Sequence, residues 1–273
     1  MNNWLESLKV ILKGAWIGGT MMIPGVSGGT MAIIMGIYDH LLSAVNSLLT
    51  NKEKRVESLI FLIKFCIGGG LGILLVARPF SLLLEMFPMP VTWFFLGAVA
   101  GGIPMIYKKS GQRLLSFKGI AYVAAGMLVL LVFTFAQNWL TASGGGQITG
   151  FAGLFVAGVI SSAALILPGI SVSYFLLILG LYEPILAAIQ TLDILYLLPL
   201  GLGVIIGIFA ISGILEAWMK RYPACAYLMI LGFVLVSLEE INPGIPTGIE
   251  IPICIVTCVA GFAFLYWMST KED

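Results

Sequence analysis

The chain has 273 residues, of which 60% are hydrophobic and only 10% are charged, and its mean hydropathy is +1.07. Because about a quarter of the residues in soluble domains are charged, this composition excludes a soluble globular protein and predicts an all-α, multi-pass protein of the cell membrane. The formal net charge is only +1, which excludes the strongly basic surface of a nucleic-acid-binding protein.

The first apolar stretch, residues 10–49, is interrupted by the sequence Pro24-Gly25-Val26-Ser27-Gly28-Gly29-Thr30. Proline removes a backbone donor and glycine permits positive φ, so a helix must stop and restart here. One straight helix would be about 60 Å long, twice the thickness of the hydrocarbon core. We therefore expect a re-entrant helical hairpin with the break at its tip. No small-residue cleavage site precedes the break, so this stretch is expected to be retained rather than removed as a signal peptide.

Three spanning helices are expected after this hairpin, at residues 59–77, 91–107 and 119–138. The first of them contains Lys64 and a glycine stripe, Gly68-Gly69-Gly70-Leu71-Gly72, which permits close helix contact in lipid. We expect this helix to end at Arg78-Pro79. The uncharged, glycine-rich residues 141–148 then form a linker, so residues 1–140 are predicted to be one structural unit.

The second half, residues 149–273, repeats the order of the first. A hairpin at 149–190 is broken at Pro168-Gly169-Ile170-Ser171, and spans are expected at 195–215, 224–238 and 250–268. In the hairpins, identical residues recur at an offset of 144 (168 − 24): Pro24 with Pro168, Gly25 with Gly169, Ser27 with Ser171, Gly36 with Gly180, Tyr38 with Tyr182 and Leu42 with Leu186. In the later spans the offset is 135 (223 − 88), and it matches Pro88 with Pro223 and Leu96-Gly97 with Leu231-Gly232.

The two repeats are expected to have opposite orientations in the membrane. Each has a hairpin and three spans, so the second repeat must enter from the side opposite to the first. Lysine and arginine gather in the segments around 9–13, 52–55, 108–118 and 220–221, whereas the other connections are neutral or acidic. By the positive-inside rule, these basic segments and both termini are predicted to be cytoplasmic.

Inverted repeats with a helix break at equivalent positions are typical of transporters whose site lies between the halves. Restarted helices offer unpaired N–H groups and hydroxyls to an anion such as phosphate. Taken alone, each break is better explained by a structural kink with serines bonded back to the preceding turn, but duplication at a constant offset favours a shared substrate site. Its predicted residues are Gly25, Ser27, Gly28, Gly29, Thr30, Gly169, Ser171 and Ser173.

Charged residues near the expected membrane interfaces are further candidates. We expect Arg78 to capture an anion at the outer side, Lys64 to follow it, and Arg221 with Lys220 to release it inside. Snorkelling of Lys64 and Arg78, and ordinary anchoring by Lys220 and Arg221, are the alternatives. The acids Asp39, Glu183 and Glu216 could couple transport to a proton gradient, or could simply be solvated at helix ends.

The motif from Pro24 to Thr30, the following Gly36-Ile37-Tyr38, and the second motif from Pro168 to Ser171 resemble those of the PopT-type polyprenyl-phosphate transporters. The resemblance covers essentially the whole chain. It implies that undecaprenyl phosphate, the lipid carrier of cell-wall precursors, is returned from the outer to the cytoplasmic leaflet. The second motif departs from the first, since Val172-Ser173 stand where Gly28-Gly29 would be expected.

Two other classes of function remain open at this point. A small-anion carrier or channel would share the helix-break site, and an intramembrane lipid phosphatase would also bind a phospholipid head. The phosphatase lacks support, because the chain has one histidine and no acid beside Ser27 or Ser171. No cofactor or metal is expected, since Cys254 and Cys258 have no acid or histidine partners. The expected partners are prenyl-phosphate and membrane lipids, with a homo-oligomer also possible.

Overall fold

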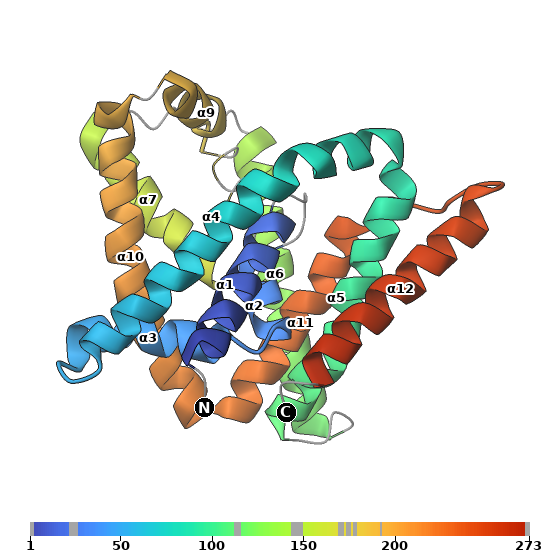
Figure 1. Cartoon of the computed structure of the whole chain (residues 1–273), viewed down its shortest axis with the longest axis horizontal. Coiled ribbons are helices and arrows are strands. Elements are labelled where there is room, and N and C mark those ends of the chain that lie inside the picture. Colours follow the sequence, from blue (N-terminus) through green and yellow to red (C-terminus); the bar gives the residue numbers. More distant parts are fainter. Residues whose placement is uncertain are drawn as a thin grey trace.

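The computed structural model describes residues 3–21, 27–111, 116–142, 150–168, 172, 176, 179–191 and 193–270. Every regular element within these residues is a helix (Figure 1), so the all-α prediction is confirmed for them. The helices are α1 (Asn3–Thr20), α2 (Gly28–Ile34), α3 (Tyr38–Thr50), α4 (Arg55–Met86), α5 (Pro88–Ser110), α6 (Phe117–Ala142), α7 (Gly150–Ile166), α9 (Tyr182–Thr191), α10 (Ile194–Arg221), α11 (Pro223–Ile241) and α12 (Glu250–Thr270).

Several helices in the described part are long and apolar enough to cross a membrane. Many large apolar side chains point outward on them, such as Leu74, Ile214 and Val256, which is the surface expected of a protein that faces lipid rather than water. The chain is therefore a multi-pass membrane protein. The candidate spans are Arg55–Leu75, Pro88–Ser110, Ile194–Arg221 and Glu250–Thr270, with α2 and α3 together as a possible fifth, broken span.

The second arm of the first hairpin is bent, not straight. Residues 30–49 were expected to form one arm, but α2 ends at Ile34 and α3 begins at Tyr38, with an angle of 112° between them. Gly36 provides this bend with a φ of 65°, and Gly180 has the same φ at the equivalent place in the second half. A positive φ suits glycine because it has no Cβ. The repeated glycine was therefore the sequence signal for this second break.

The helix that was expected to end at Arg78-Pro79 does not end there. α4 continues through Pro79 to Met86. A proline removes one helical hydrogen bond, which neighbouring groups and local adjustments can compensate in membrane helices.

The same helix pairings occur in both halves of the chain. In the first half α1 packs along α4, and in the second half α7 packs along α10. Two further pairs cross between the halves, because α5 packs along α12 and α6 packs along α11. α5 and α11 are equivalent helices and contact each other, so they lie at the centre of the arrangement.

Equivalent glycines make these pairings close. A Cβ atom at Gly68 would lie 2.1 Å from the carbonyl oxygen of Ile11 in α1, and a Cβ at Gly203 would lie 2.1 Å from that of Phe155 in α7. Gly68 and Gly203 are 135 positions apart (203 − 68), the offset already found between the later spans. The helix backbones can approach so closely only because these positions lack a side chain. Gly97 and Gly232, and Gly126 and Gly261, make equivalent contacts at the same offset.

α3 follows Gly36 and α9 follows Gly180, and these two helices lie at opposite ends of α10 (Figure 1). Near the C-terminal end of α10, Asn46 of α3 donates a hydrogen bond to Glu216. Near its N-terminal end, Ile185 of α9 belongs to an apolar cluster against which Tyr196 packs. These two contacts therefore lie near opposite ends of one helix of 28 residues.

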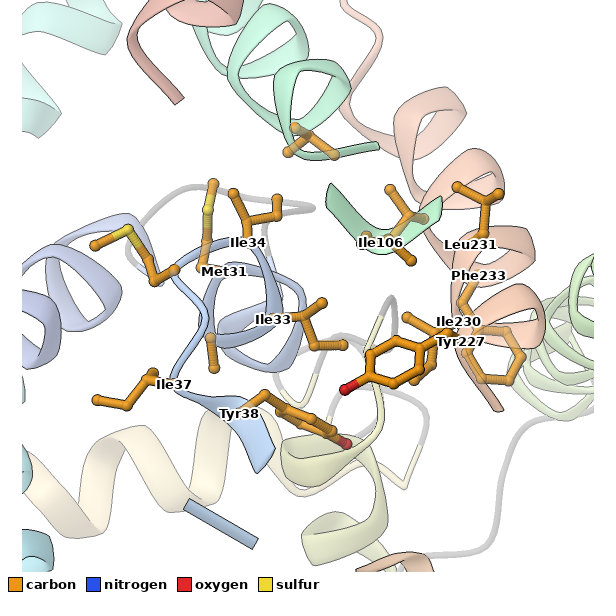
Figure 2. Close-up of a cluster of buried hydrophobic side chains, with 14 of the residues drawn as sticks. Met31, Ile33, Ile34, Ile37, Tyr38, Ile106, Tyr227, Ile230, Leu231 and Phe233 are labelled. Carbon is orange, nitrogen blue, oxygen red and sulfur yellow. The ribbon is translucent and has the colours of Figure 1, made fainter. Parts of the chain in front are cut away.

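The main apolar core surrounds α2. All residues of this helix after Gly28 are buried. Figure 2 shows that Met31, Ile33 and Ile34 of α2 share one apolar cluster with Ile106 of α5 and Leu231 of α11. The short helix after the first break is thus held inside the protein, next to the two central helices, rather than in lipid.

Candidate functional site

The N-terminal end of α2 lies at the end of the first Pro-Gly motif. Ser27 precedes the helix in an extended conformation, with φ −82° and ψ 132°. Ser27 is only 7% exposed, yet its side chain makes no capping hydrogen bond to the helix. Ser27 is therefore a buried residue at the break whose hydroxyl does not cap the start of α2. Thr30, one turn later, is also buried.

Gly29 joins the first motif to the second. A Cβ atom at Gly29 would lie 2.8 Å from the carbonyl oxygen of Ile166 and 3.3 Å from the backbone nitrogen of Pro168. Pro168 is buried and opens the second motif. The start of α2 and the start of the second motif therefore meet, although they belong to different halves of the chain. We call this contact of Ser27–Gly29 with Ile166–Pro168 the junction.

A hydrogen bond reinforces the junction. The buried hydroxyl of Tyr38 donates to the carbonyl oxygen of Ile166 at 3.0 Å, across 128 positions of sequence. This carbonyl lies at the C-terminal end of α7, where no helical N–H group is available to satisfy it. The sequence analysis used Tyr38 only to align the repeats. Its match with Tyr182 at the same offset was the one sequence signal for a structural role.

Part of the predicted site lies outside the described residues. This applies to Gly25, Gly169, Ser171 and Ser173. Arg78 belongs to α4, but its side chain is likewise outside the described part. Of the predicted site residues, Ser27, Gly28, Gly29 and Thr30 lie at the start of α2, and Gly29 is the one placed against Ile166 and Pro168.

Two predicted cations have partners that are not part of the junction. Lys64 donates to the hydroxyl of Ser7 at 2.7 Å, near the end of α1 that is remote from the break. Arg221 is the last residue of α10, and its Nε donates to the hydroxyl of Tyr222 at 3.1 Å. Lys64 thus joins α4 to the first turns of α1, and Arg221 pairs with the residue that follows α10.

Asp39 anchors the start of α3 to the two central helices. One carboxylate oxygen accepts hydrogen bonds from Lys109 Nζ of α5 at 2.9 Å and from the hydroxyl of Tyr227 of α11 at 2.6 Å. The Lys109 ammonium also lies 5.6 Å from the centre of the Tyr227 ring. Figure 2 shows Tyr38 and Tyr227 extending toward each other beside this cluster. Polar side chains therefore hold the start of α3, just after the junction, against α5 and α11.

Glu216 anchors the other end of α3 to α10. Its carboxylate is buried and accepts hydrogen bonds from Asn46 at 2.7 Å and Lys220 at 2.5 Å, and Ser43 lies beside it. The third predicted acid, Glu183, is exposed in the first turn of α9. The sequence singled out the acids but missed their partners Lys109, Tyr227 and Asn46, because nothing in their spacing links them to α3.

Comparisons with known proteins show which family the chain resembles. Residues 17–250 match the model of a family described as undecaprenyl phosphate translocase-like. A Vibrio cholerae serotype O1 protein named polyprenyl-phosphate transporter is 32% identical over 255 residues, covering 88% of this chain and 79% of the relative. A Staphylococcus aureus protein of the same name is 32% identical over 264 residues, covering 92% of each chain. No solved structure matches.

Proposed function

The chain belongs to the undecaprenyl phosphate translocase-like family, and on this premise we propose that it carries a polyprenyl phosphate across the membrane by binding the phosphate headgroup at the junction. The family and the two relatives are named as transporters rather than enzymes. The tail of such a lipid can stay in the bilayer, so the protein must shield only the head.

The observation that carries this proposal is the contact between Gly29 and Pro168. It joins the only two Pro-Gly-aliphatic-Ser sequences of the chain. Irregular backbone at membrane depth persists only where it is buried in protein or lines a cavity. Bringing two such breaks together gathers backbone N–H groups and hydroxyls at one place, which a bare phosphate needs because its transfer into hydrocarbon costs many kcal/mol.

We further propose that residues 1–140 and 149–273 are inverted repeats about this site. The recurring glycine contacts and the placement of α3 and α9 at opposite ends of α10 support this arrangement. With both termini cytoplasmic, the basic ends of α4, α5 and α10 lie inside. Arg78 would then take up the headgroup from the outer leaflet, Lys64 and Arg221 would lie on the cytoplasmic side, and transport would run inward to recycle the carrier of envelope precursors.

Leaflet exchange in proteoliposomes tests the proposal. Purified protein is reconstituted with a fluorescent prenyl phosphate, and the outer leaflet is probed with an impermeant quencher. The proposal requires protein-dependent exchange of the intact lipid. Release of inorganic phosphate would instead indicate a phosphatase, and flux of free phosphate without a tail would indicate a small-anion pathway.

Glu216 is the acid we propose for proton coupling, because its carboxylate is buried where α3 meets α10. A pH gradient imposed across the same liposomes should change the exchange rate of the wild-type protein. In Glu216→Gln, which cannot take up a proton, exchange should no longer respond to the gradient. Lys220→Met is the matched control, since it removes the same ion pair but keeps the acid. Equal responses of wild type and Glu216→Gln would contradict this role.

A further inference from the structure

A polar pocket of about 120 Å³ lies between α3 and the start of α4, away from the junction. This is room for several water molecules and for a phosphoryl group. The polar side chains that line the pocket are His40, Ser43, Ser47, Lys54, Glu57 and Ser58.

The turn that carries Lys54 is fixed by side-chain hydrogen bonds. The Asn51 side-chain oxygen accepts from the backbone N–H groups of Glu53 at 3.0 Å and Lys54 at 3.2 Å. The Nε of Arg55 donates to the carbonyl oxygen of Leu48 at 2.8 Å. These bonds join the end of α3 to the start of α4, so one wall of the pocket is held against the other.

Several side chains in the pocket take no part in the polar contacts described above. The side chains of Lys54, Glu57 and Ser58 form no hydrogen bond or ion pair within the described residues. Ser58 lines the pocket, and its hydroxyl can donate to a ligand there. The His40 ring is held in place by stacking on Phe61, with the ring centres 4.1 Å apart and the planes 10° apart.

We propose that this pocket binds a phosphate monoester headgroup in its singly protonated form. Lys54 and the serine hydroxyls donate to the unprotonated oxygens. The protonated oxygen donates to Glu57, which can only accept while it is ionised. Sulfate has no proton to donate at neutral pH, so its oxygen would face the Glu57 carboxylate with like charge. The carboxylate therefore selects phosphate over sulfate.

The pocket lies beside the basic turn that is predicted to be cytoplasmic. If the proposed function holds, the pocket is where the headgroup stops after it leaves the junction. Ser43 lines the pocket and lies beside Glu216, so one side chain separates an occupant of the pocket from the proposed coupling acid. Anion binding at the pocket does not itself depend on transport, and the two can be tested separately.

Titration calorimetry on the detergent-solubilised full chain tests the pocket with inorganic phosphate, geranyl phosphate and sulfate. Both phosphates should bind, and sulfate should bind at least about tenfold more weakly. Lys54→Met should weaken phosphate binding about tenfold, the loss of one charge-assisted hydrogen bond. Lys52→Met is the matched control, because it removes a charge from the same turn but does not line the pocket.

Glu57→Gln tests the selectivity. The glutamine amide can donate to an unprotonated oxygen, so sulfate should approach phosphate in affinity. Equal affinities for phosphate and sulfate in the wild type, or equal effects of Lys54→Met and Lys52→Met, would overturn the proposal. Binding of geranyl phosphate without any binding of inorganic phosphate would also do so. Phosphate binding without leaflet exchange would reject the transport proposal and leave the pocket assignment standing.

Discussion

Gly29→Ala should reduce prenyl phosphate exchange in proteoliposomes by about tenfold or more. The new methyl group would lie 2.8 Å from the carbonyl oxygen of Ile166, a separation that real Cβ atoms do not adopt, so α2 would have to move away from α7. A displacement that weakens headgroup binding by about 1.4 kcal/mol is sufficient for a tenfold change. No other single substitution opens the proposed site so directly.

Gly28→Ala is the neighbouring comparison. Its methyl group would meet the sulfur of Met21 at 2.9 Å, and this flexible side chain can move aside. We therefore expect a clearly smaller loss of exchange than for Gly29→Ala. Thermal unfolding of both variants separates lost transport from lost folding. Equal exchange by Gly29→Ala and the wild type, with both folded, would place the substrate site elsewhere.

Gly72→Ala should cause a large loss of stability. A Cβ atom there would lie far inside the van der Waals contact distance of the carbonyl oxygen of Ala15 in α1. The two helices would have to separate, and overpacking of this kind typically costs about 1–3 kcal/mol. The midpoint of thermal unfolding in detergent is expected to fall accordingly.

Gly70→Ala is the matched control in the same helix. Nothing lies within 4 Å of a Cβ at Gly70, so alanine should be neutral or should stabilise α4 by about 0.5–1 kcal/mol. The second half offers the same comparison. A Cβ atom at Gly203 would meet the backbone of Phe155 in α7, whereas a Cβ at Gly201 would meet nothing within 4 Å. If Gly203→Ala were as harmless as Gly201→Ala, the two halves would not share one mode of packing.

Much of the helical architecture could be predicted from the sequence, because apolar length and helix breaks act locally. The expected spans at 91–107, 195–215 and 250–268 lie within α5, α10 and α12. The boundary at Pro79 was wrong because a long membrane helix can absorb one proline. The bend at Gly36 was missed because residue 36 was used only to align the repeats, although its φ of 65° turns the chain.

The site was harder to predict than the helices. The Pro-Gly motifs indicated where helices break, and the contact of Gly29 with Pro168 lies where two such breaks were expected to meet. The polar contacts that hold α3 in place could not be predicted from the sequence. Asp39 pairs with Lys109 and Tyr227, and Glu216 with Asn46, so each link joins residues far apart in sequence. Such pairs depend on how helices pack, which no local pattern specifies.

The crossed packing of α5 with α12 and of α6 with α11 has a consequence for biogenesis. Gly97 of α5 lies against Cys258 of α12, yet the ribosome completes α12 long after α5. The glycine-lined faces of the first half must therefore wait in the bilayer, shielded by lipid or by the insertion machinery, until the last helix arrives. Neither half is a self-sufficient folding unit, and an ancestral single-copy protein of this design would have needed a second molecule to complete its packing.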